Sequence, residues 1–128
     1  MILHIATRAE WECAQTRGVY RPSGLAADGF IHCSTVSQVL ATANSFFRGQ
    51  RDLLLLCIDE GKLAAPLRYE SAAPPAGVSS AEPRGALFPH LYGELSLDAV
   101  TGVLEFPCSA EGAFELPAGL ERDKDLAP

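Results

Sequence analysis

One stretch of the sequence decides how the chain folds: Asp28-Gly29-Phe30-Ile31-His32-Cys33-Ser34-Thr35. It is typical of a strand that leads directly into a helix, with Gly29 opening the strand and Thr35 capping the helix. Because side chains alternate along a strand, Phe30, His32 and Ser34 are expected on one face. An imidazole and a hydroxyl contribute little to the packing of an apolar strand, and burying either one costs free energy unless it forms a hydrogen bond. This stretch is therefore the first candidate for a functional site.

Two helices are predicted in the N-terminal half. Residues 8–16 follow a strand at residues 3–6, and Thr7 and Glu10 have the spacing of a capping box. A second capping box, Thr35 with Gln38, opens the next helix, whose apolar residues recur at the spacing of one helical face: Val36, Val39, Leu40, Ala43 and Phe47. Between the two helices, residues 19–24 are predicted as an exposed connection.

The rest of the chain is rich in predicted strands. Residues 53–58 form an unbroken apolar run, which is typical of a strand covered on both faces. Further strands are predicted at 67–70, 87–95 and 103–106. If residues 87–95 are extended, His90, Tyr92 and Glu94 share one face.

Two segments differ from the rest in composition. Residues 71–86 consist mostly of Ala, Pro, Ser and Gly, a long loop that could serve as a lid. We expect a single domain over residues 1–109 and a loosely ordered tail over residues 110–128.

Composition excludes several classes of protein. A net charge of −6 and a pI near 4.9 argue against binding nucleic acid through clustered Lys and Arg. The N-terminus has neither a basic region nor a long apolar run, so we expect no signal peptide, no membrane span and a cytoplasmic protein. The four cysteines are widely spaced, and we expect free thiols and no structural zinc.

All three histidines, His4, His32 and His90, fall in or at the edges of predicted strands. One interpretation is that the strands bring His32, His90, Ser34, Tyr92 and a glutamate to one cleft. The other is that each imidazole bonds a backbone carbonyl or a carboxylate and only stabilises the sheet. A three-histidine metal site would need all three rings to converge, and no closely spaced pair supports it, so no metal is predicted.

Other side chains that could react or bind a ligand also have a structural interpretation. Cys33 follows His32, but strand alternation sends the two to opposite faces, which argues against a cysteine nucleophile. Trp11 and Tyr20 could stack on a flat ligand, although Trp11 also suits the core of the first helix. Arg21 or Arg48 could bind a pyrophosphate; in the structural interpretation, each is a solvated surface charge.

With these segments in view, the chain resembles the domain of unknown function 952 family over about residues 2–106. The residues that carry the resemblance are Ile5, Glu10-Trp11, Gly18, the stretch 28–35 with Gln38, Gly49-Gln50, Asp52-Leu53, Tyr69-Glu70 and Phe88-Pro89-His90-Leu91-Tyr92-Gly93. The elements Gly-Phe-Ile-His-x-Ser and Phe-Pro-His-Leu-Tyr-Gly together are far more specific than either alone.

The resemblance implies a fold similar to that of ADP-ribosyltransferases, which cleave the nicotinamide bond of NAD. Carried over in chain order, His4 would hold the adenosine ribose, the Ser34 region would position the nicotinamide side, and Glu94 or Glu70 would be the late-strand carboxylate. His32, Glu70, His90 and Tyr92 belong to the typical pattern of the family. A carboxylate near the anomeric carbon would stabilise the oxocarbenium ion that forms as the glycosidic bond breaks.

We therefore expect a small α+β domain that resembles the ADP-ribosyltransferase fold, with a bent or split, mainly antiparallel sheet and two N-terminal helices. The expected function is binding of NAD or another nucleotide, with ADP-ribosyl transfer or NAD glycohydrolysis as the reaction. The alternative is a non-catalytic module that binds a small molecule or a protein. The candidate catalytic residues are Glu70, Glu94, His32 and His90, and the candidate ligand-binding residues are His4, Ser34, Tyr92, Gly29 and Arg48.

Overall fold

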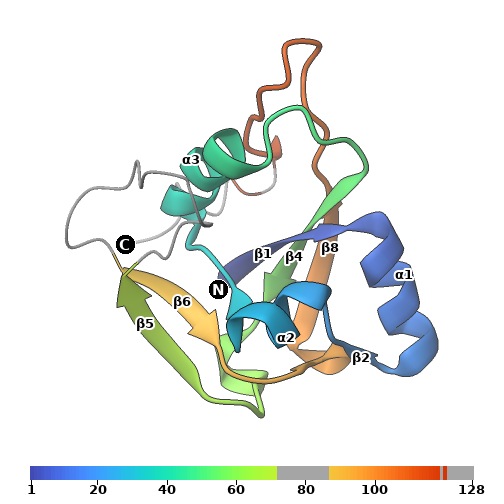
Figure 1. Ribbon diagram of the computed structural model, residues 1–128, viewed down its shortest axis with the longest axis vertical. Helices are drawn as coiled ribbons and strands as arrows, with labels where there is room; N and C mark the ends of the chain where they lie inside the picture. Colours follow the sequence, from blue (N-terminus) through green and yellow to red (C-terminus); the bar gives the residue numbers. More distant parts are fainter. Residues whose placement is uncertain (72–86, 119, 121–128) are drawn as a thin grey trace.

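The computed structural model describes residues 1–71, 87–118 and 120, which form an α+β fold with antiparallel sheets (Figure 1). The first sheet has the order β1-β4-β8 and consists of β1 (Ile2–Thr7), β4 (Leu53–Ile58) and β8 (Val100–Glu105). Every residue of β4 is buried, as its unbroken apolar sequence predicts. This strand is the centre of the fold.

A second sheet contains parts of both distinctive stretches. Its order is β3-β6-β5, formed by β3 (Ile31–His32), β6 (Leu87–Leu91) and β5 (Leu67–Ser71). A two-stranded sheet pairs β2 (Val19–Tyr20) with β7 (Leu95–Ser96). The expectation of a split, mainly antiparallel sheet is confirmed.

The two predicted N-terminal helices are present as α1 (Arg8–Arg17) and α3 (Val36–Phe46). Each begins at the predicted capping box, where the Thr7 hydroxyl accepts from an α1 backbone N–H and the Gln38 side chain accepts from the backbone N–H of Thr35. Short 3-10 helices lie at η1 (Glu60–Lys62) and η2 (Leu97–Ala99). No helix in the described part of the chain is long and apolar enough to cross a membrane.

The first sheet has an apolar cluster on each face. On one face, alternate residues of β1 and β4 pack with Ile31 and Leu91 of the second sheet and with Leu95 of β7. On the other face, the remaining residues of β1 and β4 pack with Val39 and Ala43 of α3. The second sheet therefore buries one of its faces against the first sheet, and its other face is left for polar side chains.

The two three-stranded sheets are joined where β3 ends. The backbones of Leu3 and Ser34 exchange two hydrogen bonds of 2.7 and 2.8 Å. This bridge fixes the start of α3, and with it the stretch that contains His32, against β1.

Two predictions of local structure are wrong. Residues 19–24 are not an exposed connection, because they contain β2 and the start of an additional helix, α2 (Ser23–Asp28), and Tyr20 is fully buried. Residues 87–95 are not one strand, because β6 ends at Leu91 and β7 begins only at Leu95, after a turn at Gly93.

The core extends beyond residue 109. Phe114 and Leu120 are buried, Phe114 stacks on Phe106, and its backbone N–H donates to the side chain of Asn44. The boundary between domain and tail stays a prediction, since residues 121–128 lie outside the described residues. The same holds for the expected lid, of which only Ser71 is described.

Candidate functional site

Three basic side chains form a row across the second sheet. In the antiparallel register, His32 of β3 lies opposite His90 of β6, and His90 lies opposite Arg68 of β5. Residues directly opposite each other share a face of the sheet. Their neighbours along the strands, Ile31 and Leu91, point into the core. The row therefore lies on the face that is turned away from the first sheet.

Glu70 is the carboxylate that completes this cluster. Nδ1–H of His90 donates to Glu70 Oε1 over 2.8 Å, and the hydroxyl of Tyr92 donates to the same oxygen over 2.6 Å. These hydrogen bonds, with that from Tyr92 the larger cause, lower the pKa of Glu70, so its carboxylate stays ionised. No described residue bonds the other oxygen, Oε2. Among the described residues, one carboxylate oxygen of Glu70 is therefore anchored by two hydrogen bonds and the other accepts none.

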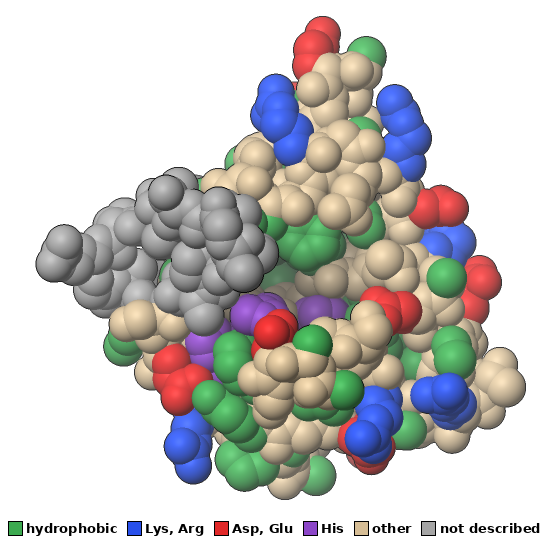
Figure 2. All heavy atoms as spheres, viewed as in Figure 1, with side chains coloured by type: hydrophobic (Ala, Val, Ile, Leu, Met, Phe, Trp, Pro, Cys, Tyr) green, Lys and Arg blue, Asp and Glu red, His purple; other side chains and the backbone are tan. Residues whose placement is uncertain are grey.

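The aromatic ring of Phe30 packs against both histidines. It stacks on His90 with centroids 4.1 Å apart and contacts His32 at 4.6 Å and Tyr92 at 5.2 Å. The guanidinium of Arg68 lies 5.2 Å from the centre of the Tyr92 ring. Figure 2 shows histidine side chains gathered in a hollow of this face, with acidic and hydrophobic side chains at its edge. These flat surfaces suit a planar ligand group.

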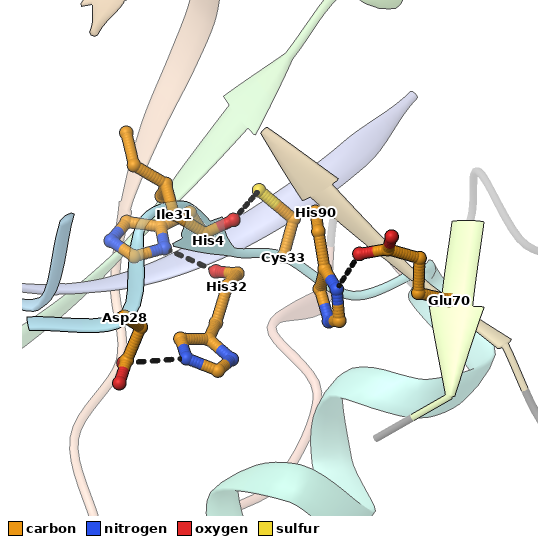
Figure 3. A network of polar contacts seen from close by, with 7 residues as sticks. All are labelled: His4, Asp28, Ile31, His32, Cys33, Glu70 and His90. Atoms are coloured by element: carbon orange, nitrogen blue, oxygen red, sulfur yellow. Dashed lines mark hydrogen bonds and ion pairs between the residues drawn. The ribbon is translucent and has the colours of Figure 1, made fainter. Parts of the chain in front are cut away.

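His32 has its own carboxylate partner. Its Nε2–H donates to Asp28 Oδ2 over 2.9 Å (Figure 3). Asp28 is the last residue of α2 and His32 follows four positions later, beyond the turn at Gly29. Gly29 has a φ of 85°, a left-handed conformation that glycine adopts without strain. Its role in the structure is to turn the chain from α2 into β3.

His4 is engaged on both ring nitrogens. Nδ1–H donates to the backbone carbonyl of His32 over 2.6 Å, and Nε2 accepts from the hydroxyl of the buried Tyr20 over 2.7 Å. Burial lowers the pKa of His4 from 6.5 to about 4, which keeps the ring neutral. With no ring nitrogen left, His4 cannot hold a ribose or be the third ligand of a three-histidine metal site. Among the described residues no group of three or more potential ligands could hold a metal ion.

Other candidates lie outside the cluster. Glu94 does not share a face with His90 and Tyr92, because the strand ends before it, and its carboxylate pairs instead with Arg21 at 2.6 Å. Arg48 belongs to the loop after α3, in which Gly49 N–H donates to the carbonyl of Gly112. This loop lies at the end of the molecule away from β5 and β6 (Figure 1).

Three further candidates are in the core. Ser34 is buried and its backbone joins the two sheets. Tyr20 cannot stack on a ligand because it is fully buried. Burial raises the pKa of Cys33 to about 12, so this thiol is not a ready nucleophile.

Sequence reasoning assigned no role to Asp28, Phe30 or Arg68. The position of Phe30, two residues before His32, was a usable signal, because strand alternation puts both on one face. Asp28 and Arg68 gave no such signal, since their places depend on the unpredicted helix α2 and on the pairing of β5 with β6.

Comparison with known proteins shows the family of the chain. Residues 5–103 match the family model described as a protein of unknown function, DUF952. The crystal structure of protein CC0527 from Caulobacter crescentus is similar, with 36% identity, a TM-score of 0.78, and coverage of 94% of this chain and 97% of that one. Its solution NMR structure matches with 35% identity and a TM-score of 0.68, covering 87% and 88%. No curated protein matches. The chain therefore belongs to the DUF952 family.

Proposed function

We propose that the cluster of His32, Glu70, His90 and Tyr92 with Phe30 is a binding site for a nucleotide, that NAD is the substrate, and that nicotinamide is released by hydrolysis or ADP-ribosyl transfer. The observation that carries the proposal is Glu70, an ionised carboxylate whose Oε1 accepts from His90 and Tyr92 and whose Oε2 is bonded by no described residue.

Such a carboxylate is suited to cleaving a glycosidic bond. As the bond between nicotinamide and ribose breaks, positive charge builds on the ribose, and a fixed anion beside it lowers the barrier. The rings of Phe30 and Tyr92 offer flat apolar surfaces for the base or the nicotinamide. Arg68 supplies the permanent positive charge that a diphosphate needs. The similarity to the ADP-ribosyltransferase fold stays a prediction from the sequence resemblance.

The test removes only the charge of Glu70. Glu70→Gln keeps a carbonyl oxygen that can accept from His90 and Tyr92, so the fold should persist. The wild-type protein should release nicotinamide from NAD, measured by chromatography, and Glu70→Gln should lower the rate by about 10²- to 10³-fold. The matched control is Glu12→Gln, an exposed glutamate of α1, which should retain the wild-type rate.

Calorimetry with NAD distinguishes the alternatives. Binding without turnover at any protein concentration would contradict the enzymatic part and favour a non-catalytic binding module. Absence of both binding and turnover would contradict the proposal as a whole.

A further inference from the structure

Two pairs of carboxylate and imidazole stand side by side in the described part of the chain. Asp28 holds one ring nitrogen of His32, and Glu70 holds one ring nitrogen of His90. The two rings lie 5.5 Å apart between centroids and are inclined by 71°. In Figure 3 the second nitrogen of His32 lies on the side of its ring toward His90, and that of His90 lies away from Glu70.

The hydrogen bonds determine which nitrogen of each ring is reactive. A carboxylate only accepts, so in the neutral rings the proton of His32 is on Nε2 and that of His90 is on Nδ1. His32 Nδ1 and His90 Nε2 then each carry a lone pair, and no described residue bonds either of them. Each ring can therefore take up or give a proton at a nitrogen whose orientation is fixed by a carboxylate.

We infer that His32 and His90 form a general base and general acid for hydrolysis of a phosphoric diester, with a nucleoside 2′,3′-cyclic phosphate as the substrate class. The inference goes beyond the proposed function, because it concerns a phosphorus–oxygen bond and does not require NAD to bind.

The environments of the two rings assign their roles. His90 is only 3% exposed and its ring orientation is fixed by the hydrogen bond to Glu70, so we assign His90 the role of the acid. His32 is half exposed, beside Asp28, and can take a proton from solvent water, so His32 is the base.

The charges around the pair suit an anionic phosphorus centre. Asp28 and Glu70 are negative, and Arg68 and one imidazolium balance them, so the cluster does not repel a phosphodiester of charge −1. Tyr92, which also lies beside the pair, donates to Glu70 and has its pKa raised by that bond, and the neutral His4 bonds the backbone carbonyl of His32. Attack in line also needs the base and the acid on opposite sides of phosphorus, so the proposal places phosphorus between His32 Nδ1 and His90 Nε2.

In the proposed step, His32 Nδ1 takes a proton from water while the water oxygen forms a bond to phosphorus. The bond from phosphorus to one ribose oxygen breaks, and that oxygen keeps the electron pair and receives the proton from His90 Nε2. The product is a phosphomonoester with a free neighbouring hydroxyl, and exchange with solvent restores both imidazoles.

The test uses 2′,3′-cyclic AMP and follows the phosphomonoester by ³¹P NMR as a function of pH. The wild-type rate should pass through a maximum, since it needs one neutral and one protonated imidazole. His32→Gln should remove the fall on the acidic side and His90→Gln the fall on the alkaline side, each lowering the maximal rate by about 10²- to 10⁴-fold. Glu12→Gln should leave the profile unchanged.

Several results would overturn the inference. One is no product above solvent background across the pH range in which imidazoles titrate. Another is a His32→Gln variant that keeps the wild-type rate and pH profile. Because the His32 ring is half exposed in the wild-type protein, this variant should fold normally. It therefore tests the inference even if His90→Gln does not fold. Nicotinamide release without ester hydrolysis would overturn this inference alone, and ester hydrolysis without nicotinamide release would overturn the proposed function alone.

Discussion

The three histidines show how the environment of a residue decides its chemistry. His4 is buried with both ring nitrogens bonded, so it stabilises the junction between β1 and β3. In the described part of the chain, His90 is as deeply buried but is bonded through one ring nitrogen only, and His32 is half exposed with one carboxylate partner. The interpretation in which an imidazole only stabilises the sheet therefore applies to His4. On each of the other two rings, one nitrogen is bonded by no described residue.

The neutral, buried His4 predicts a loss of stability in mild acid. Its folded pKa of about 4 lies below the unfolded value of 6.5, so the unfolded chain binds the proton first as the pH falls. Stability is lost between pH 6.5 and pH 4, with no further loss from this group below that range. From pH 7 to pH 5 the free energy of unfolding should drop by about 2 kcal/mol on this account.

Urea unfolding at the two pH values checks this prediction. His4→Gln removes the titrating group. Between pH 7 and pH 5 its free energy of unfolding should therefore fall by about 2 kcal/mol less than that of the wild-type protein. The ring protons of His4 should also show no titration in NMR spectra above pH 5. Equal pH dependence in the two proteins would mean that His4 is not the group responsible.

At the scale of elements, the end of β6 determines which glutamate joins the cluster. Tyr92 N–H still bonds the carbonyl of Pro66, but Gly93 has a φ of 156° and turns the chain toward β7. A Cβ at Gly93 would lie 2.7 Å from Cβ of Ala65, closer than real Cβ atoms approach. The turn leaves Glu70 beside Tyr92 and carries Glu94 away to Arg21.

Gly93→Ala should therefore destabilise the protein by about 1–3 kcal/mol, because the added methyl group must displace backbone or strain it. Thermal or urea unfolding measures the effect. Gly102→Ala in β8 is the matched control, since its Cβ would meet Cys57 at an ordinary 3.7 Å, and it should cost much less. Equal losses in the two variants would show that the turn at Gly93 is not sterically constrained.

At the scale of the whole molecule, elements with strong local signals were predicted correctly. The capping boxes at Thr7 and Thr35 mark α1 and α3, and the apolar run of β4 marks the central strand. Tyr20 was missed because β2 has two residues and exists only through its pairing with β7. The choice of Glu70 over Glu94 likewise depends on how β5 pairs with β6, which no local pattern encodes.

The sheets act together to form the site. β1 orients β3 through the Leu3–Ser34 bridge and through His4, while β5 brings Glu70 and Arg68 to the edge of β6. Residues far apart in the chain thus gather on one polar face, and the apolar clusters on both sides of β4 hold that face in place.

The measurement that tests this account most directly is a proton NMR titration with NAD, following the ring signals of the three histidines assigned through single His→Gln variants. We predict that the signals of His32 and His90 shift together and saturate, whereas those of His4, bonded on both nitrogens, stay in place as an internal control. If neither His32 nor His90 shifts at millimolar NAD, or if His4 shifts with them, the cluster is not the nucleotide site described here.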